Sequence, residues 1–106
     1  MSLHFLFIIS FTTMGKKIVA IFRVPDMTSE SYYQILKDLE ANGLAHPTGR
    51  LSHVATSGDS GMVVIDTYDS QEALQRFGDG LMPILAKNGV TPPQPEVTVI
   101  ENEVTP

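Results

Sequence analysis

Short stretches of alternating or continuous apolar residues predict four strands. Residues 16–24, KKIVAIFRV, are rich in β-branched side chains and end at Pro25, which is typical of a strand. Two further strands, roughly residues 50–57 and 62–68, flank the sequence GDSG, which suits a hairpin turn because glycine and aspartate tolerate turn dihedral angles. The sequence EVTVIENEV predicts a last strand over residues 96–104.

Two stretches with helical spacing lie between these strands. The first helix is expected to begin after Thr28 as N-cap, with Glu30 favoured in the first turn by the helix dipole, and to end at residues 42–43, Asn-Gly. Its apolar stripe consists of Tyr32, Ile35, Leu36 and Leu39.

The second helix is expected to begin at Asp69, because Asp69 and Glu72 have the spacing of a capping box. The sequence GDG at residues 78–80, followed by Pro83, predicts a break. Residues 82–89, MPILAKNG, are therefore expected to form a separate helical turn or two.

The resulting order is β-α-β-β-α-β, which predicts an α+β, ferredoxin-like fold with a four-stranded antiparallel sheet. The first and third strands have apolar residues on both faces: Ile18, Ala20 and Phe22 oppose Val19 and Ile21, and Met62 and Val64 oppose Val63 and Ile65. Strands of this kind are buried on both sides. Two helices cover only one face of the sheet, so a second copy is expected on the other, giving a homodimer.

Composition narrows the classes of partner. The chain has 106 residues, a net charge of -5 and no cysteine, which indicates one soluble domain without disulfides, thiolate metal ligands or a cysteine nucleophile. Nucleic-acid binding is not expected, because Lys16 and Lys17 form the longest basic run. The three histidines and the scattered aspartates match no zinc or calcium spacing, and a cytoplasmic location is expected.

Residues 1–15 are interpreted as an N-terminal extension, from an early start codon or a tag, that forms an extra strand or arm if ordered. The apolar run Leu3 to Phe11 is too short to span a bilayer, so no membrane contact is expected. Residues 16–106 are interpreted as the single domain.

The hairpin turn sets a register between the second and third strands. It places Ser57 opposite Met62, Ala55 opposite Val64, His53 opposite Asp66 and Leu51 opposite Tyr68. His53, Asp66 and Tyr68 then share one face near the end of the sheet, where a carboxylate either favours the charged imidazole or orients the neutral ring as a base. A one-residue bulge would change this arrangement.

Two interpretations of this group remain open. In one, a small apolar or aromatic ligand binds beside a purely structural His53–Asp66 pair, and Tyr68 fills the core. In the other, His53 acts as general base on an enolisable substrate, with Asp66 and Tyr68 as catalytic partners. Phe22 and Arg23, near the end of the first strand, are the candidate ligand-binding residues; Arg23 suits an anionic ligand, a helix C-terminus or a solvated rim.

Four segments together resemble a known superfamily: VPDMTSESYYQIL, GRLSHVA, DSGMVVIDTYDSQEALQRF and LMPILAKNG. Their order and spacing are similar to those of the dimeric α/β-barrel superfamily, and most closely to its small, uncharacterised members related to the antibiotic-biosynthesis monooxygenase domain. The resemblance covers about residues 16–104. It implies a ferredoxin-like protomer whose sheet packs against that of a second copy to form a barrel, with a cavity between sheet and helices.

Relatives in this superfamily include cofactor-independent monooxygenases of polycyclic quinol-like substrates, heme-degrading monooxygenases and lactone isomerases. Some of these monooxygenases rely on a tryptophan and an asparagine, whereas this chain has no tryptophan and no asparagine in its first strand. Tyr68 stands where relatives carry an aromatic residue, commonly tryptophan. The resemblance therefore argues against heme degradation and implies oxygenation or isomerisation without a cofactor, using His53, Asp66 and Tyr68.

Overall fold

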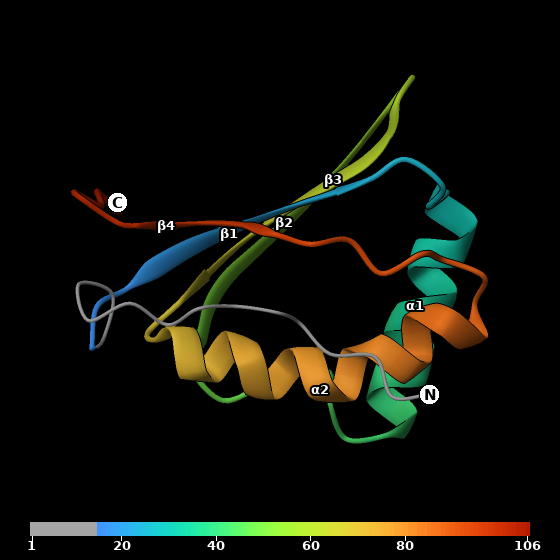
Figure 1. Cartoon of the computed structure of the whole chain (residues 1–106), viewed down its shortest axis with the longest axis horizontal. Coiled ribbons are helices and arrows are strands. Elements are labelled where there is room, and N and C mark those ends of the chain that lie inside the picture. Colours follow the sequence, from blue (N-terminus) through green and yellow to red (C-terminus); the bar gives the residue numbers. More distant parts are fainter. Residues whose placement is uncertain (1–14) are drawn as a thin grey trace.

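The computed structural model describes residues 15–106, so the predicted extension lies outside the described residues apart from Gly15. Four strands and two helices follow one another in the predicted order (Figure 1). They are β1 (Ile18–Val24), α1 (Ser29–Ala41), β2 (Arg50–Gly58), β3 (Gly61–Tyr68), α2 (Gln71–Lys87) and β4 (Glu96–Val99).

All strand pairs are antiparallel, and the spatial order is β2-β3-β1-β4. This is the predicted ferredoxin-like α+β arrangement, in which both helices lie against one face of the sheet (Figure 1). The core between sheet and helices contains Ile18, Ala20, Phe22 and Val24 of β1, all buried. No helix within residues 15–106 is long and apolar enough to cross a membrane.

The N-terminus of α1 confirms the predicted cap. The Thr28 hydroxyl accepts a hydrogen bond from the backbone N–H of Ser31 at 3.1 Å, and the Ser31 hydroxyl accepts one from the backbone N–H of Thr28 at 2.9 Å. This reciprocal pair satisfies two amide groups that the helix itself leaves unbonded. Ile35 and Leu39 are buried on the face of α1 that packs on the core.

The predicted break in the second helix is wrong, because α2 continues through Gly80 and Pro83 to Lys87. Its apolar face is buried along its whole length, and this burial outweighs the unfavourable helix propensities of glycine and proline. Gly80 serves packing: a Cβ there would lie 2.8 Å from Leu44 Cδ1. The N-cap is Ser70 instead of Asp69, and its hydroxyl accepts from the backbone N–H of Ala73 at 3.1 Å.

The last strand is shorter than the predicted residues 96–104 because its partner strand ends. Val99 lies opposite Ile18, the first residue of β1, and Ile100 adds one further backbone bond to the carbonyl of Lys17 at 3.0 Å. Of the described residues that precede Ile18, residues 15–17, none belongs to a strand, so β4 ends at Val99.

The predicted register between β2 and β3 is confirmed from Ser57 to His53 and wrong beyond it. The structure has a β-bulge, so that Arg50 and not Leu51 lies opposite Tyr68, while Ser52 lies opposite Thr67. A bulge inserts one residue into one strand and reverses the alternation of faces on its far side. It therefore turns Arg50 toward the helices and leaves Leu51 exposed.

The sheet face away from the helices, here called the open face, has an apolar centre. It contains Val19, Ile21, Val54, Val63 and Ile65, of which Val54 is 54% exposed and Ile65 38%.

Candidate functional site

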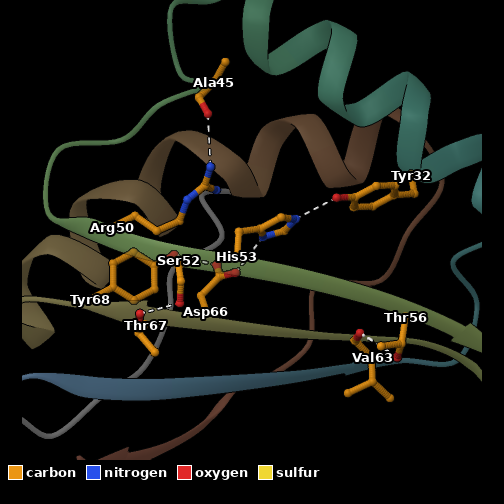
Figure 2. Close-up of polar contacts among 10 residues, drawn as sticks. All are labelled: Tyr32, Ala45, Arg50, Ser52, His53, Thr56, Val63, Asp66, Thr67 and Tyr68. Carbon is orange, nitrogen blue, oxygen red and sulfur yellow. Dashed lines mark hydrogen bonds and ion pairs between the residues drawn. The ribbon is translucent and has the colours of Figure 1, made fainter. Parts of the chain in front are cut away.

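His53 and Asp66 form a close pair on the face of the sheet that the helices cover. They lie opposite each other in β2 and β3, and His53 Nδ1 is 2.6 Å from Asp66 Oδ1 (Figure 2). The Asp66 side chain is 3% exposed and that of His53 is 25% exposed, so the carboxylate is almost completely buried while the imidazole remains partly accessible. On its other side Asp66 lies opposite Ala20, whose small side chain leaves room for the carboxylate.

Tyr68 provides a second hydrogen bond to the Asp66 carboxylate. Its hydroxyl donates a hydrogen bond to Asp66 Oδ2 at 2.8 Å, and the residue is fully buried. Burial, and next the neighbouring Asp66 carboxylate, raise the pKa of the Tyr68 phenol, which keeps it protonated as a donor. Each Asp66 oxygen therefore has its own partner, and none of the buried side-chain polar atoms in residues 15–106 lacks one.

Tyr32, from the first turn of α1, contacts the opposite end of the imidazole. Its hydroxyl oxygen is 2.6 Å from His53 Nε2, and the two ring planes are parallel to within 2° (Figure 2). Partial burial, and to a lesser degree Tyr33 and Asp66, raise the pKa of the Tyr32 phenol, so it acts as a hydrogen-bond donor. A neutral imidazole that donates from Nδ1 to Asp66 accepts this bond at Nε2.

Arg50 brings a positive charge to the same region. Its guanidinium donates to the backbone carbonyl of Ala45 at 3.1 Å (Figure 2). It also lies 5.6 Å from the ring centroid of Phe77. Among the described residues, no carboxylate lies within 4 Å of this guanidinium. Arg50 is therefore a partly buried cation whose charge is not neutralised by a direct ion pair.

A cavity of about 70 Å³ lies between the sheet and the two helices. Tyr32, Arg50, His53 and Asp66 line it together with an apolar wall made of Phe22, Val24, Met27, Ile35, Leu36, Leu39, Val64, Phe77, Leu81, Leu85 and Pro93. This volume is large enough for a few water molecules and too small for an aromatic ring system.

The structure brings most of the sequence-predicted site residues together. His53, Asp66 and Tyr68 form one hydrogen-bonded chain, and Phe22 lines the cavity. Arg23 lies apart from them: it is on the open face, its side chain is 64% exposed, and it forms an ion pair with Glu96 at 3.5 Å.

Two polar residues of the cavity wall were missed from the sequence, and only Tyr32 had a signal there. Tyr32 was assigned to the apolar stripe of the first helix, although a tyrosine in a buried stripe normally directs its hydroxyl to a polar partner. Arg50 precedes Leu51 at the start of a strand, and only the bulge brings it to the helix-covered face.

The chemistry available here is that of an oriented base. Asp66 holds the imidazole by Nδ1, which leaves Nε2 as the acceptor on the cavity side. In residues 15–106 no cluster of histidine, aspartate or glutamate side chains has the geometry of a metal site.

Solved structures with the same fold were identified by comparison. One is a protein from Caulobacter crescentus CB15 assigned as an antibiotic biosynthesis monooxygenase, with 22% identity and a TM-score of 0.54 over 87% of this chain and 93% of that one. Another is the monooxygenase from the gene ActVA-Orf6 of Streptomyces coelicolor, in complex with the ligand nanaomycin D, with 15% identity and a TM-score of 0.53 over 90% and 95%.

A third, from Chloroflexus aurantiacus J-10-fl, carries the same assignment as the Caulobacter protein, with 13% identity and a TM-score of 0.52 over 84% of this chain and 95% of that one. No family model matches the sequence, and no curated protein matches it significantly. At these identities the likeness concerns the fold. The chain thus has the ferredoxin-like fold that is found in antibiotic biosynthesis monooxygenase-like proteins.

Proposed function

We propose that the protein binds a small apolar or aromatic ligand in the cavity between sheet and helices, and that His53 removes an acidic proton from it. The observation that carries this proposal is the position of His53 in the cavity wall: Nδ1 is held 2.6 Å from a buried carboxylate, while Nε2 is directed toward Tyr32, another residue of that wall. The Streptomyces neighbour, crystallised with nanaomycin D, supports a ligand-binding role for this fold.

The reaction class is that of a cofactor-independent monooxygenase or an isomerase. Removal of a proton next to a carbonyl group gives a carbanion. The carbanion is either reprotonated at another position, which is isomerisation, or reacts with dioxygen and a proton to give a hydroperoxide. Loss of water from the hydroperoxide then leaves a new carbonyl group, so that one oxygen atom enters the ligand and the other leaves as water. Arg50, a cavity-lining cation without an ion-pair partner within 4 Å in the described part of the chain, favours the negative charge that develops on the ligand.

Hydrogen–deuterium exchange tests the proton-removal step. The probe is 2-indanone in D2O, whose methylene protons are followed by proton NMR in the presence of wild-type protein, His53→Gln and His46→Gln. The exposed His46 of the loop before β2 is the matched control. General-base catalysis accounts for about 10²- to 10⁴-fold, so His53→Gln should lose at least about 100-fold of the protein-catalysed exchange, whereas His46→Gln keeps it. Equal exchange by wild type and His53→Gln contradicts the proposal.

A second candidate, ligand binding without catalysis, is favoured by one observation: Nε2 is already bonded to the Tyr32 hydroxyl. In that case His53 and Asp66 are a structural pair. His53→Gln would then lower the melting temperature, while 2-indanone would exchange no faster with wild-type protein than in buffer.

The proposed assembly is a homodimer joined through the open face. The helices cover only the other face, and Val54 and Ile65 leave an apolar centre exposed on a single chain. Light scattering should give twice the 11.6 kDa of one chain for the wild type. Ile65→Asp should give the monomer mass, and Val104→Asp, at a site 86% exposed outside the sheet, should remain dimeric. A monomeric wild type contradicts this assembly.

A further inference from the structure

The hydroxyl of Tyr32 occupies the atom that the proposed base must offer to a ligand. It lies 2.6 Å from His53 Nε2, with the phenol ring in a plane parallel to the imidazole. A ligand whose proton His53 removes has to place that proton at Nε2. The structure therefore shows the base with its reactive position already filled by a residue of the same chain.

Tyr32 also restricts the space beside His53. Its side chain is part of the cavity wall, and the free volume that remains is about 70 Å³, too little for an aromatic ligand. Displacing the phenol ring would join the ring's own volume to the cavity and free Nε2 in the same movement.

The Tyr32 side chain packs against the edge of the core without being enclosed by it. Tyr32 is only half-buried, and it lies in the first turn of α1, four residues after the N-cap Thr28. Beyond the bond to His53, its aromatic neighbour is Tyr33, an edge contact with ring centroids 5.3 Å apart, and Tyr33 is itself 62% exposed. Asp66 and Tyr68, in contrast, are buried and hydrogen-bonded on the opposite side of the imidazole, so the base stays in place when Tyr32 leaves.

We propose that Tyr32 is a displaceable cap on His53: its phenol closes the cavity and blocks Nε2 until a ligand that places a hydroxyl group or another acidic proton at Nε2 replaces it. The proposal rests on the proposed function, in which His53 is the group that the ligand meets. For a hydroxyl ligand the exchange is nearly even in hydrogen bonds, because one O–H donor on Nε2 replaces another. Ligand affinity is therefore determined by apolar contacts inside the opened cavity minus the cost of displacing the cap.

Tyr32→Phe tests the cap because it removes the competing hydrogen bond and keeps the ring. The probe is 2-naphthol, whose binding is followed by its own fluorescence. Loss of one competing bond should tighten 2-naphthol binding to Tyr32→Phe about fivefold over wild type. Tyr33→Phe, the matched change on the adjacent exposed tyrosine, should bind like the wild type.

The double variant Tyr32→Phe/His53→Gln separates the two proposals. A cap on His53 gives no gain in 2-naphthol affinity when Nε2 is absent, so the double variant should bind no more tightly than His53→Gln alone. In the 2-indanone assay, Tyr32→Phe should lower KM about fivefold; a fall in kcat at constant KM would instead identify Tyr32 as a proton donor and overturn the cap.

Failure of the proposed role of His53 and failure of the cap give different results. If wild type and His53→Gln exchange the 2-indanone protons equally fast, the proposed role of His53 fails and the cap fails with it. If His53→Gln loses the 2-indanone exchange but Tyr32→Phe binds 2-naphthol no more tightly than wild type, the role of His53 stands and the cap alone is overturned. The melting temperature of each variant shows whether that variant is folded at the temperature of the binding assay.

Discussion

Tyr68→Phe removes one buried hydroxyl group and should destabilise the fold by about 2 kcal/mol. The hydroxyl donates to Asp66 Oδ2 at 2.8 Å, and Tyr68 itself is fully buried. The ring remains and fills the same space, so the change creates almost no cavity. What is lost is the donor to one oxygen of a carboxylate that is 3% exposed.

The magnitude follows from the type of bond. Hydrogen bonds to charged groups contribute roughly 1.5–3 kcal/mol, and a buried acceptor left without its donor keeps the cost of its desolvation. A loss of about 2 kcal/mol corresponds to a decrease of roughly 10 °C in the melting temperature of a domain of this size. Asp66 also positions His53, so the 2-indanone exchange should slow in the same variant.

The effect should depend on pH in a defined direction. Burial raises the pKa of Tyr68 above the ordinary value for tyrosine of about 10. A phenol with a higher pKa in the folded chain than in the unfolded chain contributes its full stability below about pH 10 and loses it as the pH rises further. The difference in free energy of unfolding between wild type and Tyr68→Phe should therefore be constant from pH 7 to 9 and shrink above pH 10.

Urea denaturation at several pH values measures this difference, with Tyr33→Phe as the control because Tyr33 is exposed. The reasoning is refuted if Tyr68→Phe unfolds within about 0.5 kcal/mol of wild type at pH 7, the range expected of a surface substitution. It is also refuted if the difference does not shrink above pH 10.

Two further substitutions test the backbone geometry by urea denaturation. Gly61→Ala should lower the free energy of unfolding by at least about 2 kcal/mol, because Gly61 has a φ of 95° and its Cβ would lie 2.5 Å from the Cα of Pro25. Gly58→Ala is the control, because a Cβ there meets open space, and it should change this free energy by less than about 1 kcal/mol. Equal losses in the two variants would contradict the argument. Pro83→Ala should stabilise the protein by about 1–3 kcal/mol. Pro83 lies within α2 with an exposed side chain, and because it has no N–H group it leaves the carbonyl of Asp79 without its helical donor. A destabilised variant would show that the proline ring is required there.

The sequence was sufficient for the fold and for the central pair because both depend on local signals. Alternating apolar residues identify the strands, and the GDSG turn determines the pairing of the residues next to it. His53 and Asp66 lie five residues from the turn on either side, close enough for the register to hold. Tyr68 was correctly placed on the same face as Asp66, from period-two alternation alone.

The errors arose where tertiary packing overrides local preference. Gly80 and Pro83 each disfavour a helix, but the buried apolar face of α2 and the close approach of Leu44 to Gly80 retain it. The contact of Tyr32 with His53 joins a helix to a strand 21 residues away, and no local pattern encodes such a distance.

The bulge in β2 shows how one residue determines the character of both faces of the sheet. Strict alternation from His53 would turn Leu51 toward the cavity and Arg50 toward the open face. The extra residue reverses this: the cation joins His53 in the cavity wall, and the open face carries one charge fewer beside its Arg23–Glu96 pair. A charge on that face would have to be desolvated on association with another sheet, whereas in the cavity it meets the Ala45 carbonyl and the Phe77 ring. The same backbone irregularity therefore supplies the site with its positive charge and removes that charge from the open face. Redirecting a side chain in this way is typical of bulges that lie next to functional sites.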